Sequence, residues 1–325
     1  MAAGDRKNPK RAKSSASRYS LMEFMQDFPD DEACLRWLWQ TSYAADDEGK
    51  TAHCMKCGEV RTFARYDKTM KQQRQSWTCT ACGTHVHPTA GTIFHKSSTS
   101  LHLWFYAIYL ITSTRCGISA KQLERELGVT YKTAWRMLNL IRKELMAQDT
   151  DQLTGNVEAD ETYVGGRPRL KDMPRKADGS IRPGKGAKSN SKTTVFGAVE
   201  RGGRVRCEVV PKGDSGGIPR RVQEFILPEA VLFTDEYVGY DKPGKGFVGH
   251  HRIRHQARIY VAGDVHTQTI EGFWSLVKRG LSGTHHAVSA KHLQGYLNEY
   301  VWRYNHRDDD SAQFLSLILR AATVI

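Results

Sequence analysis

The sequence predicts a multidomain α/β protein in which a cysteine-rich module and a helical pair precede a larger domain of strands and helices. Three observations support this prediction. Two CxxCG motifs lie between residues 54 and 83, two short amphipathic helices joined by a glycine are expected in residues 117–145, and strand-like segments from residue 156 onward carry carboxylates within or directly after them. A chain of 325 residues is long enough for two or three domains with cores of their own.

Composition narrows the class of protein. The 48 Lys and Arg against 35 Asp and Glu give a net charge of +13, which favours a polyanionic partner, most commonly nucleic acid. No apolar run reaches the roughly 18 residues of a membrane helix, and the N-terminus lacks the apolar core of a signal peptide. Four of the seven cysteines stand in CxxC pairs, which favours metal in a reducing compartment over disulfides. We therefore predict a cytoplasmic protein that does not associate with membranes.

The predicted domains follow the changes in composition along the chain. Residues 1–19 form a disordered basic tail, residues 20–95 hold N-terminal helices and the cysteine module, and residues 96–150 hold the helical pair. Residues 151–325 form the α/β domain. Its basic loop, residues 167–192, carries nine Lys or Arg and two Asp. This loop either clamps DNA phosphates or is a solvated insertion between two strands.

The two CxxCG motifs predict a structural zinc site. Thiolates two residues apart converge on one ion, and the following glycine lets the chain fold back beneath the sulfurs. Four thiolates close a tetrahedral site without an open position, so the zinc is architectural. The expected ligands are Cys54, Cys57, Cys79 and Cys82.

Residues 117–145 predict a helix-turn-helix. Ser119 is expected to cap a first helix that ends at Leu127, Gly128 makes the turn, and Thr130 caps a second helix. The second helix would present three side chains to DNA near its N-terminus: Tyr131, Lys132 and Arg136. A helical hairpin that only packs against its neighbours has the same pattern, so the DNA-binding interpretation rests also on the basic charge.

Carboxylates lie within one predicted strand, at the end of another and in a predicted helix. Asp160 lies in a strand whose alternation puts Glu158, Asp160 and Thr162 on one face, and Asp235 follows the apolar run Val231–Phe233. Glu271 follows Asp235 after 35 intervening residues, in a helix where Lys278 lies two turns further on the same face. Both aspartates are followed directly by a glutamate, so spacing alone does not choose between the members of each pair.

These segments resemble DDE-type insertion-sequence transposases, and more narrowly the ISXO-like class, which has an N-terminal zinc ribbon. The resemblance covers about residues 20–310 and rests on Asp160–Gly166, on Thr234 with Asp235, and on His266–Arg279. Gln268 departs from the pattern, since the family commonly has Asn there. The resemblance implies a ribonuclease-H-like, retroviral-integrase-type catalytic domain.

The resemblance also implies a site and a reaction. It places the catalytic triad on Asp160, Asp235 and Glu271, which would hold two magnesium ions, or manganese as a substitute. Lys278, Arg279 and His266 are the expected contacts to DNA phosphates. The implied reaction is cleavage at element ends followed by transfer of the free 3′-hydroxyl strand to target DNA.

The expected partners are double-stranded DNA, as element ends and as target, and further copies of the chain that join two ends on the nucleoid of a bacterium. Three alternatives remain: a zinc-ribbon and helix-turn-helix regulator, a nuclease without strand transfer, and an inactive transposase relative. A regulator gives no role to the three carboxylates, and a joined DNA product distinguishes a transposase from a nuclease.

Overall fold

The computed structural model describes residues 19–65, 76–114, 116–165, 192–214, 216–253, 266–309 and 313–323. The predicted basic tail lies outside the described residues except for Tyr19, and the predicted basic loop except for Lys192. The chain divides into two compact units. One contains residues 1–145 and 308–325, and the other contains residues 146–307.

The first unit combines helices with a small sheet. Its helices are α1 (Leu21–Asp27), α2 (Asp31–Ser42), α3 (Leu101–Ser113), α4 (Ala120–Leu127), α5 (Tyr131–Leu140), the π-helical turn η2 (Ile141–Leu145) and α11 (Gln313–Ala322). Ser20, Asp30 and Ser100 cap the first three helices by accepting backbone N–H groups, as short polar side chains do at this position. Helix α3 is buried over most of its length, which agrees with its nearly all-round apolar sequence.

The sheet of this unit is four-stranded and antiparallel. Its strands lie in the order β1 (Thr51–Cys54), β2 (Glu59–Ala64), β3 (Trp77–Cys79) and β4 (His85–Val86). The sheet is anchored to α2 by two stacked indoles, since the ring centroids of Trp39 and Trp77 lie 4.6 Å apart with the planes 2° from parallel. Strands this short bury little apolar surface, and the stacked rings of Trp39 and Trp77 add to the small core.

Helix α11 belongs to the first unit, although the sequence boundaries extended the α/β domain to residue 325. Phe314 is buried and contacts the rings of Phe24 and Phe28, and the Ser42 hydroxyl donates a 2.8 Å hydrogen bond to the Ala322 carbonyl. An amphipathic period predicts that a helix has an apolar face but does not identify the surface that covers it. The aromatic cluster of α1 and α3 provides that surface.

The second unit is built on a five-stranded mixed sheet. Its strands are β5 (Asn156–Val164), β6 (Thr193–Glu200), β7 (Val205–Val210), β8 (Val231–Thr234) and β9 (Gly249–Arg252), in the spatial order β7-β6-β5-β8-β9. Strands β5, β6 and β7 are antiparallel neighbours, whereas β8 runs parallel to β5 and β9 parallel to β8. The mixed α/β class predicted from the sequence is therefore confirmed.

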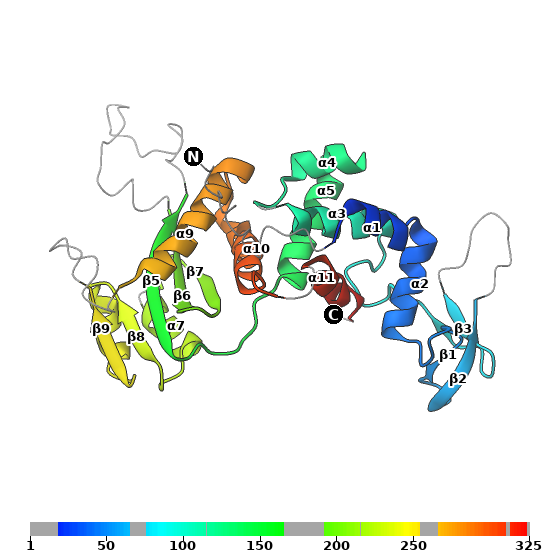
Figure 1. Cartoon of the computed structure of the whole chain (residues 1–325), viewed down its shortest axis with the longest axis horizontal. Coiled ribbons are helices and arrows are strands. Elements are labelled where there is room, and N and C mark those ends of the chain that lie inside the picture. Colours follow the sequence, from blue (N-terminus) through cyan, green and yellow to red (C-terminus); the bar gives the residue numbers. More distant parts are fainter. Residues whose placement is uncertain are drawn as a thin grey trace, which may run out of the picture. The chain divides into compact units, whose positions relative to one another are not determined.

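Helices cover both faces of this sheet (Figure 1). Helices α9 (Gln268–Gly280) and α10 (Leu293–Asn305) pack on one face, and α7 (Gly217–Phe225) packs on the other. The shorter helical segments are η4 (Val238–Tyr240), α8 (Asp241–Gly244), η6 (Leu281–His285) and η7 (Ala290–His292). Side chains alternate along the strands, so that Val195 and Val199 of β6 join the α9 core while Phe196 and Ala198 join the α7 core.

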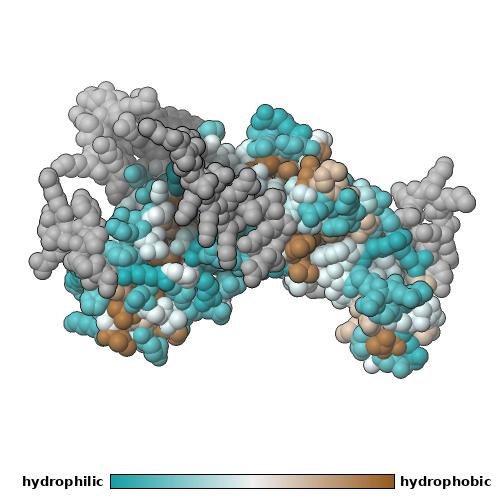
Figure 2. All heavy atoms as spheres, viewed as in Figure 1, coloured by the Kyte–Doolittle hydropathy of each residue, from teal (hydrophilic) through white to brown (hydrophobic). Residues whose placement is uncertain are grey.

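The described surface is largely hydrophilic on the face shown in Figure 2, where apolar residues form small separate patches. In the part of the chain that the structure describes, no helix has the length and apolar character needed to cross a membrane.

Candidate active site and metal centre

Strand β5 presents Asp160 to α9 and Glu161 to the opposite face of the sheet. The indole Nε1–H of Trp274 in α9 donates a 3.1 Å hydrogen bond to Asp160 Oδ2. The Glu161 carboxylate instead accepts a 2.7 Å hydrogen bond from the hydroxyl of Tyr240, a residue of the α7 core. The two acidic neighbours therefore have different hydrogen-bond partners, although both line the pocket described below.

The close packing of Trp274 depends on a glycine in the neighbouring strand. Gly197 of β6 lies opposite Asp160 in the antiparallel register. A Cβ atom added at Gly197 would lie 2.5 Å from a ring carbon of Trp274. The missing side chain thus leaves room for the indole that binds Asp160.

Gly197→Ala is expected to lower the free energy of unfolding by about 1–3 kcal/mol, because the added methyl group overlaps a rigid ring. The measurement is urea denaturation followed by tryptophan fluorescence. Gly272→Ala is the matched control, since a Cβ at this glycine of α9 meets nothing within 4 Å and alanine is the better helix former. Equal stability of Gly197→Ala and wild type would contradict the packing argument.

Asp235 follows β8 directly and lies at the same edge of the sheet as Asp160. Glu158 of β5 pairs with Phe233 of β8 in parallel register, and Asp160 and Asp235 each lie two residues beyond this last pair, close enough for their charges to interact. Asp235 Oδ1 accepts a 2.9 Å hydrogen bond from the backbone N–H of Tyr237, which fixes the turn after the strand.

Glu271 lies in the first turn of α9, where the Thr267 hydroxyl donates a 3.1 Å hydrogen bond to its carboxylate. The helix carries Glu271 and Lys278 along one side of a pocket of about 380 Å³. The pocket is lined by Asp160, Glu161, Thr162, Glu271, Trp274, Ser275, Lys278 and Arg279. The predicted two-turn spacing of carboxylate and cation on one helix face is therefore realised.

Negative charge is concentrated around Asp160. Burial raises the pKa of Asp160 to about 7, with further contributions from repulsion by Glu161, Asp235 and Glu271. This cluster of carboxylate oxygens fits divalent magnesium or manganese, which neutralise such charge and prefer oxygen ligands.

Glu158, like Trp274 and Thr267, is a residue of this site that the sequence did not identify as functional. Its side chain is fully buried, and it binds both Arg201 and the first turn of α9. The sequence feature that could have pointed to Glu158 is the alternation of side chains along β5, which places Glu158 on the same face as Asp160. That alternation does not reveal that a helix N-terminus covers the position.

His266 lies against Glu158 rather than in the pocket with Lys278 and Arg279. Its Nδ1 atom is 3.1 Å from Glu158 Oε1, but the contact lacks the alignment of a hydrogen bond. Its predicted contact with DNA stays a prediction.

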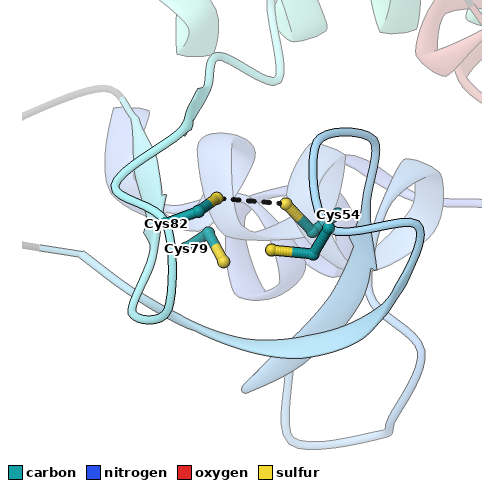
Figure 3. Close-up of side chains that lie close together, drawn as sticks. Cys54, Cys79 and Cys82 are labelled. Carbon is teal, nitrogen blue, oxygen red and sulfur yellow. Dashed lines mark hydrogen bonds between the residues drawn. The ribbon is translucent and has the colours of Figure 1, made fainter.

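The first unit brings together the four cysteines predicted to bind metal. The sulfurs of Cys54, Cys57, Cys79 and Cys82 all lie within 4.8 Å of one another. Figure 3 shows the side chains of Cys54, Cys79 and Cys82 converging, with the sulfurs of Cys54 and Cys82 3.5 Å apart. Hydrogen bonds with Thr84 lower the pKa of Cys82, whereas hydrogen bonds with Cys82 and Cys54 raise the pKa of Cys57, so the four sulfurs interact as one group.

Two glycines shape the turns at this cluster. Gly58 and Gly83 have φ values of 76° and 75°, a region that side chains disfavour. Their N–H groups donate to the carbonyls of Cys54 and Cys79, at 2.8 and 2.9 Å. This four-sulfur cluster fits a tetrahedral ion such as zinc.

Helices α4 and α5 form the helical pair predicted from residues 117–145. The side chains of Ser119 and Thr130 cap the two helices, and Gly128 ends the first with a φ of 64°. The apolar side chains of Leu123 in α4 and of Ala134 and Leu138 in α5 are fully buried. The predicted DNA-contacting residues Tyr131, Lys132 and Arg136 are all exposed at the N-terminal part of α5.

Comparison with known proteins identifies the class of the second unit. Residues 152–305 match the model of the ISXO2-like transposase domain. This segment contains the whole five-stranded sheet and the three predicted catalytic carboxylates.

Two relatives extend the comparison. The chain is 30% identical over 275 residues to an uncharacterized protein in transposable element ISH50 of Halobacterium salinarum, covering 83% of this chain and 91% of the relative. It is 27% identical over 105 residues to an uncharacterized transposase-like protein of Haemophilus influenzae, covering 32% of this chain and 84% of the relative. The chain belongs to the ISXO2-like transposase family.

Proposed function

We propose that this protein is an insertion-sequence transposase that binds the ends of its element, cleaves DNA strands and joins the freed 3′ ends to target DNA. One observation carries the proposal. Asp160, Asp235 and Glu271 come from two parallel strands and a crossing helix and lie close enough for their charges to interact, and the pocket beside them also holds Lys278. Carboxylates for metal and a cation for phosphate are the groups that phosphodiester chemistry needs.

The proposed catalytic domain is ribonuclease-H-like. The supporting features are three antiparallel strands, β5 to β7, continued by β8 and β9 in parallel to β5, with helices on both faces. The placement of the carboxylates at β5, after β8 and on α9 agrees with the triad order that the resemblance implied.

Asp160, Asp235 and Glu271 would together hold two magnesium ions, for which manganese is a substitute. Such ions, when bound, neutralise the phosphodiester and activate the attacking and leaving oxygens. Trp274 orients the Asp160 carboxylate, and Thr267 orients that of Glu271. Lys278 and Arg279, exposed on the last turns of α9, hold the phosphate next to the site.

The first unit is proposed to recognise DNA. The four-cysteine sheet is a zinc ribbon with one structural zinc ion, and α4 with α5 is a helix-turn-helix whose exposed Tyr131, Lys132 and Arg136 contact the element end. Because two ends are joined in one complex, the active form is proposed to be a homo-oligomer on double-stranded DNA, in the cytoplasm with the nucleoid.

The test is incubation of the purified protein with labelled DNA from the ends of its own element, with magnesium, manganese or a chelator. Nicked ends and joined strands on a denaturing gel are expected with either metal and are expected to be absent with the chelator. DNA of the same length with scrambled ends is the substrate control. Binding to the ends without any product in either metal would instead support the regulator or inactive-relative hypothesis, and nicking without joined DNA would support a nuclease.

A further inference from the structure

We infer that Glu158 is a positioning residue that holds the N-terminus of α9 against the sheet and so fixes the direction of the Glu271 carboxylate. The inference rests on the proposed function, because it assigns Glu158 a role in the metal site rather than in the fold alone. Glu158 has no exposed surface, which makes an ionised side chain costly unless it is fully bonded.

The bonds of Glu158 are directed at the first turn of α9. Its Oε2 atom accepts the backbone N–H groups of Thr269 and Ile270 at 2.8 and 3.0 Å, and its Oε1 atom accepts the Thr269 hydroxyl at 3.0 Å. The residue before the helix, Thr267, makes no side-chain cap of its own. A carboxylate from β5 therefore replaces the local cap, and its charge is favourable at the positive end of the helix.

Thr267 is consequently available for a different bond. Its hydroxyl donates to Glu271 Oε1 instead of capping the helix. The two contacts form a connected path from the sheet to the predicted metal ligand, because Glu158 fixes the turn and Thr267 at its start directs Glu271.

Arg201 completes the arrangement from the β6–β7 turn. Its Nε–H donates to Glu158 Oε1 at 2.8 Å, and its Nη2 donates to the carbonyl of His266 at 2.8 Å. Its guanidinium also lies 4.0 Å from the ring centroid of Phe233, two residues before Asp235. The ion pair of Glu158 and Arg201 thus connects the strand of Asp160, the strand of Asp235 and the helix of Glu271.

Glu158→Gln is the variant that tests this role. The amide has nearly the same shape as the carboxylate, but one of its two oxygens is replaced by an NH₂ group. This NH₂ group must face either the Arg201 donor or the two N–H donors of α9. In both orientations a donor faces a donor, so at least one of these hydrogen bonds is lost. Glu299→Gln is the matched control. Glu299 is also fully buried and pairs with Arg303 at 3.0 Å, but it lies on α10 and does not contact α9 through this pair.

Two readouts are made on the full-length protein. Hydrogen exchange of peptides covering residues 267–274 should be about tenfold faster or more in Glu158→Gln and unchanged in Glu299→Gln, because only the first variant loses the bonds at the helix start. The second readout is the dissociation constant for Mn²⁺, measured without DNA. Only the Mn²⁺ binding that is lost in Asp160→Asn is counted as binding to the proposed site. This dissociation constant should rise about tenfold in Glu158→Gln and stay within about twofold of wild type in Glu299→Gln.

The outcomes separate the inference from the proposed function. Wild-type exchange in Glu158→Gln would overturn the inference, and so would faster exchange with unchanged Mn²⁺ affinity, since Glu158 would then be a cap alone. Absence of Mn²⁺ binding in the wild type would contradict the proposed metal site. The exchange rates would in that case still decide whether Glu158 holds the helix.

Discussion

Replacement of Asp160 or Asp235 by Asn, or of Glu271 by Gln, is expected to reduce end cleavage by about 10³-fold or more. Each amide keeps the shape of the side chain but removes one of the charges that compensate divalent ions, so the site no longer concentrates metal. Binding to element ends is expected to stay within about threefold of wild type. The removed charge is negative, and the proposed end-recognition residues lie in the other compact unit.

Cleavage is measured on denaturing gels and binding by fluorescence anisotropy, on the same preparations. Glu161→Gln and Glu236→Gln test the register of the carboxylates, since each replaces the acidic neighbour of a predicted ligand. If these glutamate variants lose activity while the aspartate variants keep it, the choice of Asp160 and Asp235 is wrong.

Cys54→Ser is expected to release zinc and to unfold the small sheet of the first unit. Structural zinc sites in small domains contribute about 10–16 kcal/mol to folding, far more than four short strands gain from their core. Trp77 lies on β3 and stacks on Trp39, so unfolding should abolish the near-ultraviolet circular dichroism of this indole pair. The second unit has cores of its own and is expected to stay folded.

The zinc content of the purified protein, measured by atomic emission, should be one ion per chain in the wild type and none in Cys54→Ser. Cys116→Ser is the control, because this cysteine is exposed and lies outside the four-sulfur group. One retained zinc ion per chain in Cys54→Ser would show that the four cysteines are not the ligand set.

The features determined by the sequence alone are those with local physical causes. The CxxCG turns form where glycine supplies a positive φ. Helices α4 and α5 begin after Ser119 and Thr130 because the hydroxyls of these residues accept first-turn N–H groups that have no partner within the helix. The spacing of Glu271 and Lys278 likewise fixes them on one face of α9, whatever the helix packs against.

Other features required the tertiary structure, because they depend on which surfaces meet. Alternation gives β5 two faces, and only the packing of α9 on one of them places Asp160 beside Trp274 and sends Glu161 to Tyr240. The apolar face of α11 likewise packs against residues of the first unit that lie far away in the sequence. Glu158 is the clearest case. Its sequence neighbours indicate an acidic strand face, but its role arises from a helix N-terminus more than 100 residues later in the chain, which no local pattern encodes.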